Sequence, residues 1–191
     1  RLGEGRAGKE CRSPRTPAQL NDADATLKQA ATDEEKINLI DVKMQNAIAM
    51  FMNIHTRFIF ENNLHEARKE NVLTDEEITE LMLAAQKESY CDSLGSYHPH
   101  FWASKLHFFI DDVPFYNFPY TFGYLFSLGI YAHAQKQGAS FEDKYIDLLR
   151  DTASMTTEDL AEKHLGIDLT KADFWQDGIN IIKKDVEEFL T

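Results

Sequence analysis

Apolar residues recur at intervals of three and four along most of the chain from residue 32 onward. The first such run is the longest, and its apolar positions are Ile37, Ile40, Met44, Ile48, Phe51 and Phe58. This spacing places the apolar side chains on one face of an α-helix. Thr32 and Glu35 stand just before the run at the spacing of a capping box, in which each side chain bonds the backbone N–H of the other residue. The pattern predicts one long helix from about residue 33 to about Lys69.

The remaining apolar runs predict five further helices, each with its own start or stop signal. A second capping box at residues 74–77 predicts a helix that ends near Ser93. Pro119 suits a first helical turn and Gly138 suits a helix end, so a helix is expected between them. Shorter helices are expected at 140–150, 156–166 and 173–191. Because no segment alternates apolar and polar residues as a half-buried strand does, the sequence predicts an all-α multi-helix bundle with short turns.

The first residues of the chain do not share this pattern. Residues 1–9 are rich in glycine and arginine, and the segment 13–17 contains two prolines that cannot continue a helix. We therefore expect residues 1–25 to form a divergent, flexible arm. Residues 26–191 are expected to form one helical domain, since a chain of 191 residues is long enough to bury a sizeable core.

Composition and charge exclude several classes of function. The net charge is −12, whereas a nucleic-acid binder needs cationic side chains to replace the counterions of phosphate. The same charge disfavours binding to an anionic membrane surface, and no apolar run approaches the roughly 20 residues that span a bilayer. Cys11 and Cys91 are far apart in the sequence and form no redox or metal-binding motif. We therefore expect a cytoplasmic protein without nucleic-acid or membrane partners.

The densest cluster of aromatic residues lies at 114–127. This stretch holds three tyrosines, four phenylalanines and two prolines in fourteen residues, and Tyr116, Tyr120 and Tyr124 are spaced four apart. On a helix, Tyr120 and Tyr124 share a face. Phenols are neutral hydrogen-bond donors near pH 7, and together with the imidazole of His107 just upstream they are typical of a site that stabilises an oxyanion. The alternative is a buried aromatic core whose hydroxyls bond one another or the backbone.

The other histidines give weaker signals of chemistry. His65 and Glu66 begin like the zinc-binding motif HExxH, but Lys69 stands where the second histidine ligand is required. His98 and His100 are a compact pair, although no cysteine or carboxylate lies close in the sequence to complete a metal site. Three further histidines are expected to be structural, one within an apolar stripe and two near helix C-termini, at His55, His133 and His164.

Four stretches of the chain resemble a known enzyme family. Residues 97–107 (YHPHFWASKLH) and 113–127 (VPFYNFPYTFGYLFS) resemble the C-terminal catalytic region of oligoendopeptidase F, and residues 148–157 and 165–175 resemble the helices that follow it. The resemblance extends from about Ala25 to the C-terminus. It implies a place in the thimet-oligopeptidase family of zinc metallopeptidases, as part of a larger helical catalytic domain around a deep substrate channel. It also implies that short peptides are cleaved by a zinc-bound water.

The resemblance also implies roles for individual residues. In that family the zinc ligands are the two histidines of HExxH and a glutamate on the next helix, and the glutamate of the motif is the general base. This chain contains no HExxH, and Gln19 falls near the expected place of the ligand glutamate. The resemblance therefore implies no metal ligand here and no tight zinc binding by this chain alone. It assigns Tyr124 to the tetrahedral intermediate, with His107 as the accompanying histidine and Tyr116 and Tyr120 as substrate binders.

Two functions follow as hypotheses. The first is a zinc-dependent metalloendopeptidase that hydrolyses short peptides, represented here by its C-terminal portion. That portion needs the missing zinc-bearing N-terminal portion as its partner and is expected to be inactive alone. The second is a non-catalytic helical module that has lost the metal but keeps a phenol-lined groove for peptide binding or protein interaction.

Overall fold

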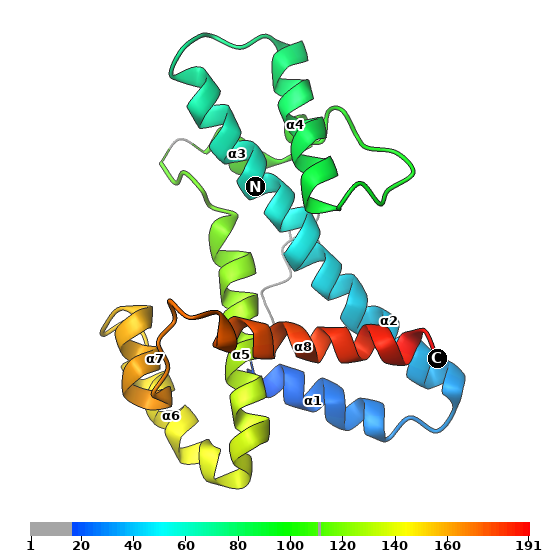
Figure 1. Cartoon of the computed structure of the whole chain (residues 1–191), viewed down its shortest axis with the longest axis vertical. Coiled ribbons are helices and arrows are strands. Elements are labelled where there is room, and N and C mark those ends of the chain that lie inside the picture. Colours follow the sequence, from blue (N-terminus) through cyan, green and yellow to red (C-terminus); the bar gives the residue numbers. More distant parts are fainter. Residues whose placement is uncertain (1–16, 111) are drawn as a thin grey trace, which may run out of the picture. The chain divides into compact units, whose positions relative to one another are not determined.

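The computed structural model describes residues 17–110 and 112–191, which are shown as coloured ribbon in Figure 1. Eight α-helices occur within this part of the chain: α1 (Pro17–Lys28), α2 (Asp33–Ile48), α3 (Ile54–Arg68), α4 (Asp75–Ser89), α5 (Phe118–Gln137), α6 (Phe141–Asp151), α7 (Thr157–Leu165) and α8 (Ala172–Phe189). No strand occurs among the described residues. The fold is all-α, as the hydrophobic pattern predicts. None of the described helices combines the length and the apolar character that crossing a bilayer needs.

The long helix expected from residue 33 to about residue 69 forms, but with an interruption. A π-helical turn at Ala49–Asn53 joins α2 to α3. At this turn the backbone N–H of Ile54 bonds the carbonyl of Ala49, five residues earlier instead of four. Such turns insert one residue into a helix and are often found at functional sites. The apolar spacing did not predict it, because one inserted residue shifts the buried stripe without ending it.

The predicted helix start and stop signals are mostly confirmed. Thr74 and Glu77 form a complete capping box at the start of α4. Thr156 accepts a hydrogen bond from the N–H of Asp159 at the start of α7, and Gly166 ends that helix with a φ of 67°. A positive φ is tolerated there because glycine has no Cβ.

The capping box expected at the start of α2 is only half formed. The N–H of Glu35 donates to Oγ1 of Thr32 at 3.1 Å, as predicted. The carboxylate of Glu35, however, accepts from the N–H of Ala31 at 2.9 Å. The carboxylate therefore caps the chain one residue earlier than the motif requires.

The flexible arm expected over residues 1–25 needs correction, because residues 17–25 belong to α1. Pro17 is the first residue of this helix, a position where its missing N–H costs no hydrogen bond. Leu20 is buried. The hydroxyl of Tyr131 on α5 donates to Oδ2 of Asp24 at 2.5 Å, and burial followed by this bond raises the pKa of Tyr131 to about 12. Apolar burial and the bond from Tyr131 thus help to hold α1 in place, while residues 1–16 lie outside the described part.

The described chain divides into two compact units. The first unit comprises Val42–Gly123, and the second comprises residues 17–41 together with Tyr124–Thr191. Each has its own apolar cluster. In the first unit α3 packs on α4 around Phe60, Met82 and Ala85. In the second, α6 packs on α7, and the buried cluster consists of Ile130, Phe141, Leu148, Leu160, Leu165 and Phe174.

Two glycines allow α5 and α8 to approach closely within the second unit. A Cβ added to Gly129 would lie 2.4–2.7 Å from three ring atoms of Phe174. A Cβ added to Gly178 would lie 2.9 Å from the backbone nitrogen of Gly129 and 3.0 Å from Cβ of Leu128. These separations are far below van der Waals contact, so the two helices can cross in this way only while both positions lack a side chain.

Gly129→Ala is expected to destabilise the second unit by about 1–3 kcal/mol, the usual cost of overpacking a core. The clash with Phe174 outweighs the gain of roughly 1 kcal/mol in helix propensity that alanine brings. The measurement is urea unfolding in a Trp102→Phe background, in which the fluorescence of Trp175 reports this unit. Lys184→Ala is the matched control, because Lys184 is exposed on α8 in the same unit. Equal midpoints for the two variants would contradict the close crossing.

Candidate functional site

Three of the four predicted site residues form a row of rings in the first unit. The imidazole of His107 stacks on the ring of Tyr116, with centroids 5.1 Å apart and an angle of 28° between the planes. The ring of Tyr116 lies in turn 5.8 Å from that of Tyr120. His107 comes from a short 3₁₀ turn at Leu106–Phe109, whereas Tyr120 lies in the first turn of α5. We call His107, Tyr116 and Tyr120 the ring row.

The ring row belongs to a segment that exposes much apolar side chain. Tyr116 is 39% exposed, and His107 and Tyr120 are half-buried. Other large apolar side chains of residues 106–118 are exposed as well, namely Leu106, Phe109, Val113 and Phe118. Exposed apolar side chains can mark a place where a protein binds a ligand or partner. The ring row adds an imidazole and two phenols, which can exchange hydrogen bonds with a ligand.

Tyr124 is placed differently from the other predicted site residues. It lies one helical turn after Tyr120 on α5 and belongs to the second unit. Its side chain is only 1% exposed, and it is among the largest fully buried side chains of the chain. A ligand can therefore reach the hydroxyl of Tyr124 only if the surrounding side chains move.

A buried polar group next to the ring row was not predicted from the sequence. Arg57 and Glu61 stand one turn apart on α3, and both are more than 90% buried. The guanidinium of Arg57 donates to Oδ1 of Asn53 from Nε at 3.1 Å and from Nη2 at 2.8 Å. Its Nη1 donates to Oδ1 of Asn117, which is fully buried, at 3.4 Å. The sequence holds little signal of this group, because the apolar stripe runs through Phe51 and Phe58, whereas after the π-helical turn the buried face includes Arg57 and Glu61.

The same buried group bonds the backbone of the segment that carries the ring row. The N–H of Phe115 donates to Oε1 of Glu61 at 2.7 Å. Phe115 has a φ of +56°, which is uncommon for a residue with a bulky side chain. Further along, Oγ1 of Thr121 donates to the carbonyl of Met50 in the π-helical turn at 2.7 Å. These two bonds join the chain to α3 before Asn117 and to the π-helical turn after it.

The structure also places the histidines considered as metal ligands. Nδ1 of His98 accepts the N–H of His100 at 3.1 Å, so this ring could bind a metal only through Nε2. Lys69 lies in the position of a second zinc ligand but binds the carboxylate of Glu66 at 2.6 Å. Among residues 17–110 and 112–191, no three side chains of His, Cys, Asp or Glu lie together as a metal site requires.

His133 and His164 make polar contacts near helix ends. Gln137 Nε2 lies 2.5 Å from Nε2 of His133, and burial lowers the pKa of this histidine, helped by the charges of Lys144 and Lys136. His164 lies in the last turn of α7, as expected. Its direct contact, however, is with a carboxylate on another helix.

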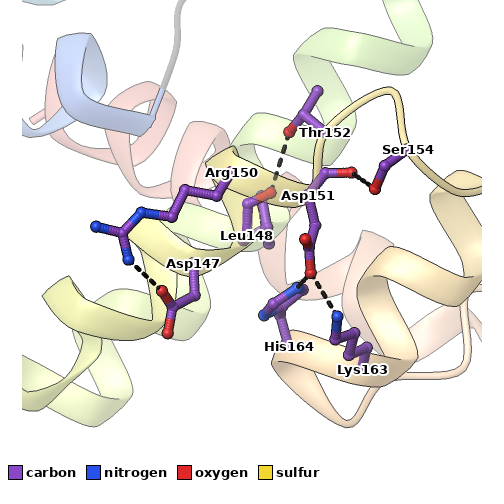
Figure 2. A network of polar contacts seen from close by, with 8 residues as sticks. All are labelled: Asp147, Leu148, Arg150, Asp151, Thr152, Ser154, Lys163 and His164. Carbon is purple, nitrogen blue, oxygen red and sulfur yellow. Dashed lines mark hydrogen bonds and ion pairs between the residues drawn. The ribbon is translucent and has the colours of Figure 1, made fainter.

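That carboxylate is Asp151. Figure 2 shows it beside Lys163 and His164, both from α7. Its Oδ2 accepts from Nζ of Lys163 at 2.5 Å and lies 2.8 Å from Nε2 of His164. The bond from Lys163, followed by that from His164, lowers the pKa of Asp151 from its ordinary value of 3.8. The cluster joins the end of α6 to the end of α7, and its hydroxyl neighbour Ser154 turns away to bond the backbone of Asp151. We therefore interpret this cluster as a structural contact that stabilises the second unit.

Acid is expected to weaken the second unit through Asp151. Because the folded pKa lies below the unfolded one, the carboxylate stabilises the fold above about pH 3.8, and this stabilisation is lost as the pH falls through the folded value. Asp151→Asn should therefore lower stability at pH 7 and flatten its decline below pH 5, in urea titrations at several pH values. Asp147→Asn is the matched control, since Asp147 forms a more exposed pair with Arg150. Parallel pH profiles for Asp151→Asn and the wild type would contradict this role.

Comparison with protein-family models, with curated proteins and with solved structures found no match to the chain.

Proposed function

We propose that the chain is the C-terminal portion of a zinc-dependent oligopeptidase and that it supplies a substrate-binding wall. The observation that supports this most is the ring row, because residues chosen from the sequence for substrate binding come together at an exposed surface. Peptide binding suits such a surface. Aromatic rings pack against peptide side chains at a small entropic cost, and phenols donate to peptide carbonyls.

The proposal assigns different tasks to the four predicted residues. Tyr116 and Tyr120 contact the bound peptide, and His107 lies beside Tyr116 as a further donor or acceptor. Tyr124 is assigned by the resemblance to the oxyanion of the tetrahedral intermediate, and its burial means that this role needs a bound peptide that displaces its present neighbours. A hydrogen-bond donor is most effective there once water is excluded.

Zinc enters this proposal only through the resemblance. The described residues form no group that fits the ion, so no metal ligand and no metal-dependent step is assigned to them. The metal is attributed to the zinc-bearing portion that the family contains. We place the enzyme in the cytoplasm, and the free, exposed thiol of Cys91 is compatible with a reducing setting.

The test is to join the chain in frame to the zinc-bearing portion of an oligoendopeptidase F and to measure cleavage of a quenched fluorescent heptapeptide. The fusion is expected to cleave the peptide and to lose activity with a chelator, while the chain alone is inactive. Tyr116→Ala should raise KM in the fusion, because it removes a contact to bound substrate. A fusion that folds and binds zinc without cleaving the peptide would overturn the proposal.

The second candidate is a peptide-binding module without catalysis, and the exposed apolar segment at 106–118 favours it. This function predicts that the chain alone binds the same heptapeptide, as measured by calorimetry. Tyr116→Ala should weaken that binding. Binding by the chain together with an inactive fusion would select this candidate, whereas an active fusion would select the first.

A further inference from the structure

The exposed fractions alternate sharply at the start of α5. Tyr116 and Phe118 are 39% and 49% exposed, while Asn117 between them is 0% exposed. Asparagine is mostly found at protein surfaces and is seldom fully buried without a hydrogen-bonding reason. The sequence therefore turns a polar side chain inward at the point where two aromatic rings turn outward.

The partner of Asn117 is itself held in place. Nη1 of Arg57 donates to Oδ1 of Asn117, while Nε and Nη2 of the same guanidinium both donate to Oδ1 of Asn53. Arg57 is only 6% exposed. Because a guanidinium is planar, the two bonds to Asn53 fix the direction in which Nη1 points. Arg57, which lies on α3, therefore fixes the position of the Asn117 side chain.

Two further bonds hold the chain on either side of Asn117. The N–H of Phe115 donates to the buried carboxylate of Glu61, and the hydroxyl of Thr121 donates to the carbonyl of Met50. Phe115 adopts a positive φ, which L residues with large side chains rarely do. Such a conformation persists only where the surroundings determine it. Here the surroundings are these polar bonds.

We propose that Asn117 is a positioning residue, whose bond to Arg57 keeps the ring of Tyr116 between those of His107 and Tyr120. Asn117 is fully buried and so does not touch the ligand. This inference rests on the proposed function, because the ring row matters only if it binds a peptide. Without the bond, the segment rotates about 115–117 and Tyr116 leaves its stacked position.

The stacking can be observed directly by NMR of the full-length chain. The imidazole protons of His107 carry a ring-current shift from Tyr116, which is defined by comparing the wild type with Tyr116→Leu. Asn117→Ala is expected to remove most of this shift and to weaken heptapeptide binding about 2- to 10-fold, the factor that corresponds to one aromatic contact. Asn117→Asp is expected to retain both, because a carboxylate keeps an acceptor for Arg57. Asn117→Asp loses only the amide nitrogen of Asn117, which makes no hydrogen bond within the protein.

Two controls separate positioning from general stability. Thr79→Val removes the hydrogen bond from Trp102 Nε1 elsewhere in the first unit and should leave the His107 shift unchanged. If Asn117→Ala does not fold, Arg57→Lys replaces it, since an ammonium keeps the charge but lacks the fixed fork. A retained His107 shift in the folded Asn117→Ala or Arg57→Lys chain would overturn the inference. A lost shift with unchanged peptide binding would leave the positioning intact and overturn the proposed function instead.

Discussion

Arg57→Ala is expected to destabilise the first unit by about 1–3 kcal/mol, the usual cost of leaving buried hydrogen-bond acceptors without their donor. The substitution takes away the donors to Asn53 and Asn117. The lost groups are nearly inaccessible to water, so solvent replaces little of what is removed. Packing is affected as well, since the guanidinium lies 5.6 Å from the ring centroid of Phe101.

The measurement is urea unfolding in a Trp175→Phe background, in which the fluorescence of Trp102 reports the first unit. Arg68→Ala is the matched control because Arg68 is exposed at the end of the same helix, and surface substitutions usually change stability by less than about 0.5 kcal/mol. If Arg57→Ala and Arg68→Ala unfold at the same urea concentration, the buried polar group contributes nothing and the inference about Asn117 loses its basis.

Local signals predicted the helices because each rests on a few neighbouring residues. A threonine and a glutamate three residues apart form the capping box at Thr74, and a glycine ends α7 at Gly166. The division into two units has no such local signal. It depends on which apolar faces meet in space, and α2 and α5 each pass from one unit to the other without a break in their sequence pattern.

The candidate site could be predicted from the sequence in part, for the same reason. Tyr116 and Tyr120 were selected by their spacing, and His107 by its place just upstream, and the structure brings all three together. The direction of Tyr124 could not be predicted, because α5 is apolar on nearly every side. From Leu128 to Ala132 five consecutive residues are buried, so no single stripe shows which face points inward. Arg57 could not be predicted, because the π-helical turn moves the buried face from the stripe through Phe51 and Phe58 onto Arg57.

Tyr124→Phe is expected to lower kcat of the zinc-bearing fusion by about 10²- to 10³-fold, the usual effect of removing one oxyanion donor. The proposed function expects KM to change little, because it assigns the hydroxyl a role only once charge develops on the substrate carbonyl oxygen. Loss of a single hydroxyl keeps the ring, so the second unit should remain folded. The rate is measured with the fluorescent heptapeptide at saturating concentration, alongside urea unfolding of the isolated chain carrying the same substitution.

Tyr131→Phe is the matched control for this prediction. Tyr131 is also a buried phenol on α5 in the second unit, and its hydroxyl donates to Asp24. Its removal should lower stability by roughly 1 kcal/mol, the typical net value of one hydrogen bond, and leave kcat unchanged. A core role for Tyr124 predicts the same result for both tyrosines, whereas an oxyanion role predicts a fall in kcat for Tyr124 alone. Equal kcat values for the two variants would therefore remove Tyr124 from the catalytic proposal and confine the chain's contribution to the ring row.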